Sequence, residues 1–137
     1  MVSNKKSKKG GIPTITLSTQ PDAGVGIRSS SYKRQYNPIR GLHRHSHYEI
    51  LVIEKGGGTH TIDYREYPVI DNQVFFLRPG QVHEFKPEPG AKFHFLALEE
   101  QALSSNAKLY LSDFEFFQTS YDTSYIVLTS LEEILEW

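Results

Sequence analysis

Short apolar stretches, separated by turn residues, make up most of the chain. Alternation with a period of two is the pattern of a strand with one buried face, whereas a continuous run such as 73–77 (QVFFL) is typical of a strand covered on both faces. Turn residues recur between these stretches at 56–58 (GGG), 71–72 (DN) and 79–80 (PG). Six or seven short strands at this spacing predict an antiparallel β-sandwich or small barrel rather than alternating strands and helices.

The turns also fix where each strand is expected. An N-terminal strand is predicted over 12–17 and a long strand over 41–56, and residues 59–62 are predicted to pair back on the long strand. Polar residues at 63–66 predict a hairpin connection. Further strands are predicted at 67–70, 73–77, 83–85, 92–98 and 125–128, whereas 28–38 is expected to be a loop or ragged edge and 99–123 shows no clean period.

The two ends of the chain differ from the predicted β-rich part. Residues 1–11 carry four lysines and almost no apolar residue, which predicts a disordered, solvated basic tail. Residues 12–128 are interpreted as one domain. At the other end, Ser130 and Glu133 form a capping box, so 129–137 is expected to be the start of a truncated dimerisation or linker helix.

Composition narrows the classes of function. The 137 residues are enough for one domain, and the net charge of -1 gives no overall positive excess for binding nucleic acid phosphates. The absence of cysteine excludes disulfides and thiolate metal sites. No apolar run has the length of a membrane span or signal peptide, and we therefore expect a cytoplasmic protein without membrane contact.

Candidate chemistry lies at the start of the predicted long strand. His43, His45 and Glu49 have the same parity as Leu51 and Ile53, so on an extended strand all five side chains leave the same face. This pattern predicts a polar cluster at the mouth of a barrel or sandwich. Imidazole and carboxylate groups are also the ligands that many transition metals use, so a metal site is an alternative interpretation.

The same residues resemble a known pair of motifs. The stretch HRHSHYE (43–49), continuing to Gly56, resembles the first cupin motif, and 79–83 (PGQVH) resembles the second. This resemblance implies a small double-stranded β-helix in which His43, His45, Glu49 and His83 point into one cavity.

A more specific resemblance covers nearly the whole chain. The patterns HxHxxYEI, KGxGTHxID, FFLRPGQVH and FLALEEQ together resemble the N-terminal sensing domain of AraC-type transcription regulators. The resemblance implies a cupin-like barrel that binds a small effector, such as a sugar or organic acid. It also implies a following helical segment that forms a homodimer and a C-terminal helix-turn-helix domain that binds DNA.

Within this interpretation, His43, His45, Glu49 and His83 are expected to line an effector pocket, without a cofactor and without catalysis. The alternatives are that these residues only cap strand ends, or that they hold a transition metal in a small metal-dependent cupin enzyme. A structural role at strand ends or on backbone carbonyls is predicted for His47, His60 and His94. The phenylalanines are predicted to form the core.

Overall fold

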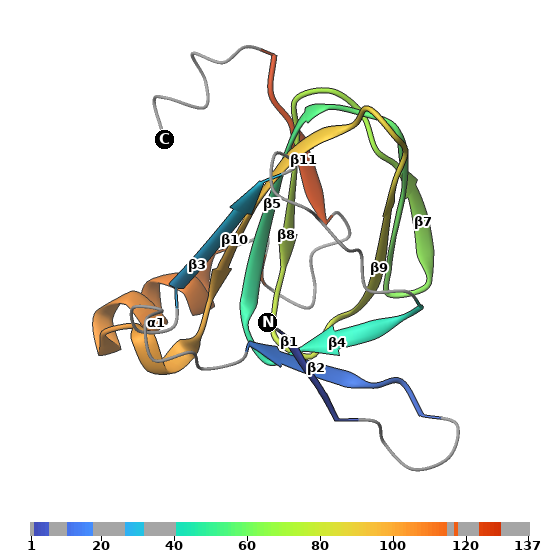
Figure 1. Cartoon of the computed structure of the whole chain (residues 1–137). Coiled ribbons are helices and arrows are strands. Elements are labelled where there is room, and N and C mark those ends of the chain that lie inside the picture. Colours follow the sequence, from blue (N-terminus) through green and yellow to red (C-terminus); the bar gives the residue numbers. More distant parts are fainter. Residues whose placement is uncertain are drawn as a thin grey trace.

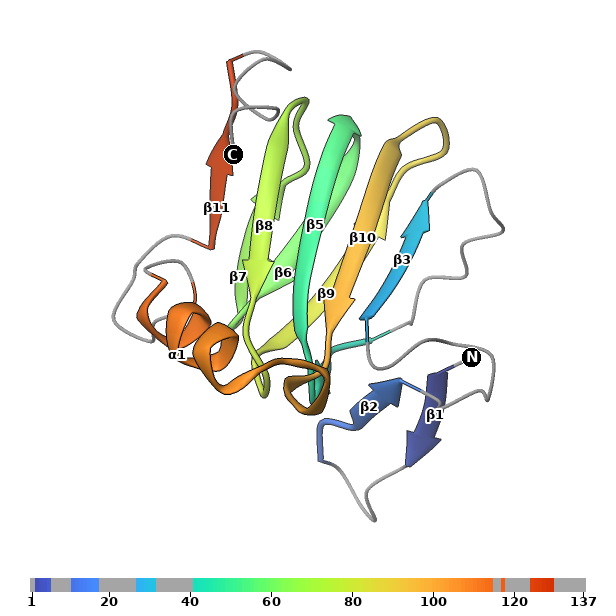
Figure 2. The same cartoon turned by 90° about the vertical axis from the view of Figure 1, so that its left-hand side faces the viewer.

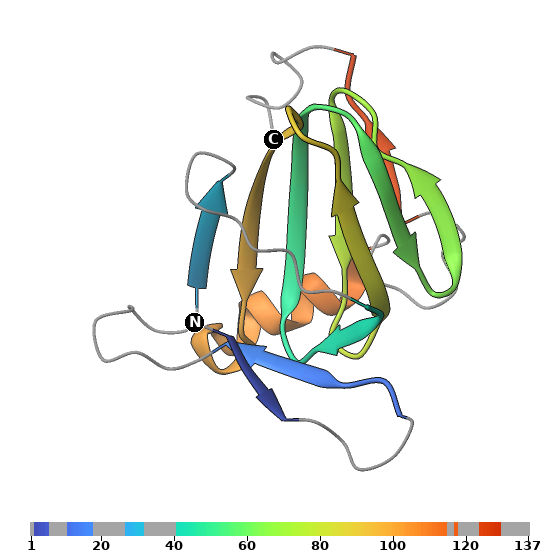
Figure 3. The same cartoon turned by 45° about the vertical axis from the view of Figure 1, so that its right-hand side comes forward.

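The structure is a computed structural model of the chain, and it describes residues 2–5, 11–17, 27–31, 41–114, 117 and 124–129. These residues form two facing sheets, which confirms the predicted mainly β, cupin-like sandwich (Figures 1 and 3). The six-stranded sheet has the order β1 (Val2–Lys5), β2 (Thr14–Leu17), β4 (His43–His45), β9 (Val82–Pro87), β6 (Gly58–Ile62) and β7 (Arg65–Pro68). The five-stranded sheet has the order β11 (Tyr125–Val127), β8 (Gln73–Leu77), β5 (Tyr48–Lys55), β10 (Lys92–Leu98) and β3 (Ile27–Ser31) (Figure 2).

The stretch 41–56 is divided between the two sheets, so the prediction of one long strand is wrong. β4 ends at His45, the chain turns at Ser46 and His47, and β5 begins in the opposite sheet. The odd positions nevertheless stay buried through the turn, because both strands turn the same side chains toward the space between the sheets. The shared parity therefore gave the correct inward direction although the assumed strand does not exist.

After β5 the chain passes back to the six-stranded sheet, and for this reason β6 does not pair back on β5 as predicted. Gly57 and Gly58 take positive φ values of 138° and 93°, which other residues rarely adopt. A Cβ atom at Gly58 would lie 2.0 Å from the carbonyl oxygen of Lys86. These glycines allow the chain to turn closely against β9, so β6 pairs with β9 and β7 instead.

The hairpin between β6 and β7 lies where a connection was predicted at 63–66, but β7 covers Arg65–Pro68 and so begins two residues before the strand predicted at 67–70. Ile62 pairs with Arg65, so the loop has two residues, and Asp63 and Tyr64 both have positive φ, at 48° and 66°. Positive φ at both central positions is the type I′ turn that fits the twist of a hairpin. Tyr64 is an unfavourable residue for this conformation, and its side chain is exposed.

Replacing Tyr64 by Gly is therefore expected to stabilise the protein by about 0.5–1 kcal/mol, because the strain of the left-handed conformation is removed. Urea denaturation measures this change. The matched control is Tyr110→Gly, which places glycine at an exposed position inside α1 (Ser105–Asp113) and is expected to destabilise. Equal effects of the two substitutions would contradict the turn assignment.

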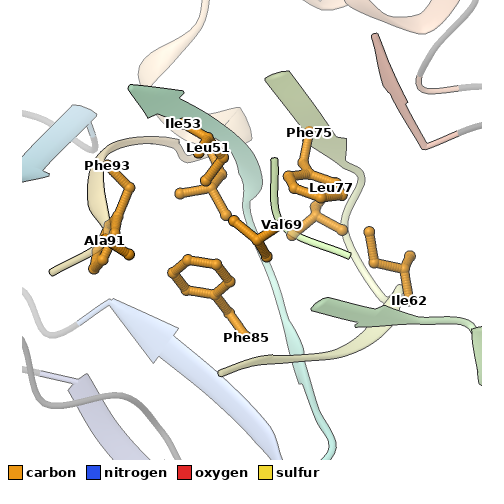
Figure 4. Packing of buried hydrophobic residues seen from close by; sticks show 9 residues of the cluster. All are labelled: Leu51, Ile53, Ile62, Val69, Phe75, Leu77, Phe85, Ala91 and Phe93. Atoms are coloured by element: carbon orange, nitrogen blue, oxygen red, sulfur yellow. The ribbon is translucent and has the colours of Figure 1, made fainter. Parts of the chain in front are cut away.

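The interior between the sheets holds the main hydrophobic core (Figure 4). β8 is buried along its whole length, which confirms the prediction of a strand covered on both faces. The core consists of Leu51, Ile53, Ile62, Val69, Phe75, Leu77, Phe85, Ala91 and Phe93. Buried polar side chains adjoin this apolar core, since the His60 ring packs against Phe75 and Phe85.

A helical segment packs on the outer face of the five-stranded sheet. A short helical turn, η1 (Glu100–Ala102), leads into α1, which begins after the N-cap residue Ser104. The Ser104 side chain accepts a hydrogen bond from the Ala107 backbone at 3.2 Å. Leu111, Phe114 and Phe117 then pack with β5 and β8 residues in a second apolar cluster, so the segment without a clean period contains a capped helix.

The ends of the chain differ from expectation at one point. Residues Val2–Lys5 form β1, which pairs antiparallel with β2, so this part of 1–11 is not the disordered tail predicted. Strand pairing uses backbone groups, so a lack of apolar side chains does not prevent it. The polar segment at 28–38 contributes part of the edge strand β3, and the helix predicted in 129–137 lies, after residue 129, outside the described residues.

Within the described part of the chain, no helix has the length and apolar character needed to cross a membrane.

Candidate functional site, a buried histidine and glutamate cluster

Six polar side chains gather inside the sandwich, each less than a tenth exposed. β4 supplies two of them, the following turn one, and β5, β6 and β9 one each. The set consists of His43, His45, His47, Glu49, His60 and His83. Because the two sheets contribute opposite sides of the cluster, no single sequence segment contains it.

The central contacts join β4 to β9 and β5. His43 and His83 are direct cross-strand partners, and their ring centroids lie 4.4 Å apart. The Nε2 atoms of His43 and His45 are 3.1 Å apart. From the opposite sheet, Glu49 places Oε2 at 3.3 Å from Nε2 of His45, 3.8 Å from Nε2 of His83 and 4.0 Å from Nε2 of His47.

Hydrogen bonds define the tautomer of His43. Its Nδ1 lies 2.9 Å from the backbone oxygen of Gly41, and a carbonyl oxygen only accepts, so Nδ1 carries the proton. In the neutral ring Nε2 then carries a lone pair, and it accepts a hydrogen bond from Nε2 of His45. His43 is thus tethered on its outer side and presents an acceptor to the interior.

Burial keeps the imidazoles neutral. Loss of solvation lowers the pKa of His43, and the Gly41 carbonyl and the Glu84 carboxylate only partly oppose this effect. Burial, reinforced by His43, lowers the pKa of His47 to about 4 and that of His60 to about 3. Burial and the surrounding imidazoles lower the pKa of His83 well below its usual range. At neutral pH these histidines therefore carry no charge.

Glu49 is affected in the opposite direction by the same cause. Loss of solvation raises the pKa of Glu49 to about 8, so its side chain is mostly protonated at neutral pH. Its contacts with His47 and His83 are then contacts between neutral groups rather than ion pairs.

The donor atoms of the cluster fit a transition-metal ion. Two overlapping sets, one of His43, His45 and His83 and one of His45, His47 and Glu49, each keep their ligand atoms within 4.8 Å of one another. Donors about 2.1 Å from a common ion lie roughly 3.0–4.2 Å apart, and the separations of 3.1–4.0 Å given above agree with this range. Glu49 Oε2 and His83 Nε2 are also buried without a hydrogen-bond partner among the described residues.

The structure brings together all four residues that the sequence singles out. It adds His47 and His60, for which only a structural role was predicted. Both had a parity signal: His47 shares the odd positions of the buried residues around it, and His60 alternates with buried Ile62 along β6. His94, in contrast, lies at the surface with its Nε2 3.3 Å from Glu54 Oε2.

The two-sheet β-sandwich and its buried polar cluster define a cupin-like binding domain. Residues 30–133 match the family model of the AraC-like ligand binding domain, and the chain belongs to that family. It is 33% identical over 73 residues to the uncharacterised HTH-type transcriptional regulator YfiF of Bacillus subtilis. It is 32% identical over 53 residues to the HTH-type transcriptional activator RhaR of Mannheimia succiniciproducens. The matches cover 53% and 39% of this chain but only 23% and 19% of these regulators.

Solved structures with a similar course of the chain have low sequence identity to it. A cupin protein from Bacteroides fragilis is 16% identical, with a TM-score of 0.42 over 74% of this chain and 75% of that chain. Oxalate decarboxylase from Bacillus subtilis is 17% identical, with a TM-score of 0.43 over 79% of this chain and 35% of that chain. At this level of similarity, neither structure carries an argument about function.

Proposed function

We propose that this chain is the effector-sensing domain of an AraC-type transcription regulator and that His43, His45, Glu49 and His83 bind a small organic effector. The observation that carries the proposal is the buried polar cluster, whose inward-facing atoms Glu49 Oε2 and His83 Nε2 have no hydrogen-bond partner among the described residues. Buried polar atoms without partners are costly, and a ligand that supplies those hydrogen bonds would remove the cost. The role is binding, not catalysis.

The strand β2 connects the pocket to the N-terminal segment, so ligand binding can affect the rest of a regulator through it. β2 pairs in parallel with β4, which carries His43 and His45, and the Arg44 backbone donates to the oxygen of Pro13 at 2.9 Å. An effector that favours one position of β4 would thereby favour one position of the N-terminal segment. In the complete regulator, we propose, this change alters a homodimer and the placement of its helix-turn-helix domains on DNA in the cytoplasm.

Thermal unfolding in the presence of sugars and organic acids tests the proposal. An effector present at about 100 times its Kd stabilises the folded protein by about 2.7 kcal/mol. We expect such stabilisation for the unchanged chain and its loss in His45→Ala, whereas His94→Ala, a surface control, keeps it. Stabilisation that survives His45→Ala undiminished would contradict the assignment of the pocket.

A second candidate is a metal-dependent cupin, favoured by the convergence of buried nitrogen and oxygen donors described above. His43, His45, His47, Glu49 and His83 would hold the ion, which would supply Lewis acidity when bound. Elemental analysis of the purified protein distinguishes the candidates. A stoichiometric transition metal that is lost in His45→Ala supports the second candidate, and metal-free protein stabilised by an organic compound supports the first.

A further inference from the structure

His60 is the most deeply buried member of the cluster and contacts it through one hydrogen bond. Its side chain is fully buried on β6, between the rings of Phe75 and Phe85, with ring centroids 4.5 and 5.3 Å away. Its Nε2 lies 2.9 Å from Nδ1 of His83 on the neighbouring strand β9. This bond is made on the side of His83 away from Nε2, the atom that faces Glu49.

The direction of this bond decides what His83 presents to a ligand. If His83 donates through Nδ1, its Nε2 is a lone pair; if His60 donates, Nε2 of His83 carries a proton. That proton would be buried 3.8 Å from Glu49 Oε2, outside hydrogen-bond distance and without another partner among the described residues. Buried donors without an acceptor are rare.

When His83 donates, the remaining proton of the pair sits on Nδ1 of His60, which also has no hydrogen-bond partner among the described residues. The His60 ring lies edge-to-face with the rings of Phe75 and Phe85, and aromatic faces are weak acceptors for an N–H group. The arrangement then matches that of His43, the cross-strand partner of His83. The Nδ1 of His43 is tethered to the Gly41 oxygen, and its Nε2 lone pair faces inward. The two central histidines would thus be held in the same way, by acceptors on their outer sides.

We propose that His60 is the positioning residue of the site: it accepts the Nδ1 proton of His83 and directs the Nε2 lone pair of His83 into the cluster. The class of ligand inferred from this arrangement rests on the proposed function. An inward Nε2 lone pair on His83 accepts a hydrogen bond or binds a cation, so at this position the site takes a hydroxyl or amine group of an effector or a transition-metal cation.

Imidazole tautomers are measured directly by long-range nitrogen–proton correlation spectra of the chain labelled with nitrogen-15 histidine. We expect the Nδ1–H tautomer for His83 in the unchanged, ligand-free chain. In His60→Leu, which removes the acceptor, His83 is expected to lose this preference, and in His60→Gln, whose amide oxygen accepts, it is expected to keep it. The Nε2–H tautomer in the unchanged chain, or the same tautomer in all three proteins, would overturn the proposal.

Calorimetric titration with Zn²⁺ supplies a second measurement. Loss of a group that orients a ligating histidine weakens metal binding by about 10–100-fold, and we expect this for His60→Leu but not for His60→Gln or the surface control His94→Ala. Unweakened Zn²⁺ binding in His60→Leu would contradict the positioning role. If the unchanged chain does not bind Zn²⁺, the metal candidate fails, while the spectra still decide the role of His60.

Discussion

Glu49→Gln is expected to make the protein more stable at neutral and alkaline pH. The folded chain holds the Glu49 proton with a pKa of about 8, against an ordinary value of 4.5. Between these values the folded state binds more protons than the unfolded state, so its stability falls as the pH rises. The loss is about 1.4 kcal/mol per pH unit and reaches roughly 4 kcal/mol near pH 8.

Glutamine has the same shape as protonated glutamic acid but does not ionise, so the substitution removes this loss. Urea denaturation of chelator-treated protein at pH 5 and pH 8 measures the effect. The two proteins should be similar at pH 5 and should diverge toward pH 8. Glu66→Gln is the matched control, because Glu66 is exposed on β7. Parallel pH profiles of Glu49→Gln and the unchanged chain would show that burial does not perturb Glu49.

Acid is expected to unfold the protein between about pH 4 and 6, because the buried histidines resist protonation. The pKa values of His43, His47, His60 and His83 are lowered from 6.5 by burial, so below pH 6.5 the unfolded chain takes up protons that the folded chain refuses. Near pH 5 the unfolded chain binds about three more protons on His47, His60 and His83, and the folded chain about one more on Glu49. Stability then falls by roughly 3 kcal/mol per pH unit, and the lowered pKa of His43 acts in the same direction.

Circular dichroism as a function of pH measures the midpoint, and its steepness reports the number of protons. His47→Gln is expected to lower the midpoint and to reduce the proton uptake by about one. His94→Ala, a change at the surface, should leave both unchanged. A transition that is as steep in His47→Gln as in the unchanged chain would contradict the inward, neutral state of His47. Together, the effects of Glu49 and the histidines place the highest stability close to neutral pH.

The pattern of apolar and turn residues predicted individual strands and turns well where side-chain packing and backbone conformation favour the same structure. β8 and β10, and the hairpin at Asp63 and Tyr64, lie where the apolar runs and turn residues placed them. Which strands pair was harder to predict. Alternation indicates a buried face but not the sheet to which it belongs, and so the division of 41–56 between β4 and β5 could not be seen.

The candidate site shows the same limit. His43, His45, Glu49 and His83 were predicted from motif spacing, and they lie together. His47 and His60 lie inside the quoted stretches HRHSHYE and KGxGTHxID, but they complete no recognisable ligand spacing there, so only a structural role was predicted for them although their parity was correct. The contact between His60 and His83 joins residues 23 positions apart through the pairing of β6 with β9, and that pairing is a property of the tertiary structure.

The interleaving of the two sheets also has a consequence for how the chain is made. From β4 to β10, only β6 and β7 are consecutive strands that pair with each other. The pairing partner of β4 is β9, and the partners of β5 are β8 and β10, so these pairs can form only after the later strands have been synthesised. The six-stranded sheet cannot be completed on the ribosome until Pro87 has been released from the exit tunnel, and the five-stranded sheet cannot be completed until Val127 has been released. Domains dominated by such distant pairings fold slowly, on a scale of about milliseconds to seconds. Nascent chains that stop before β10 are therefore expected to expose the apolar faces of β5 and β8 and to depend on chaperones.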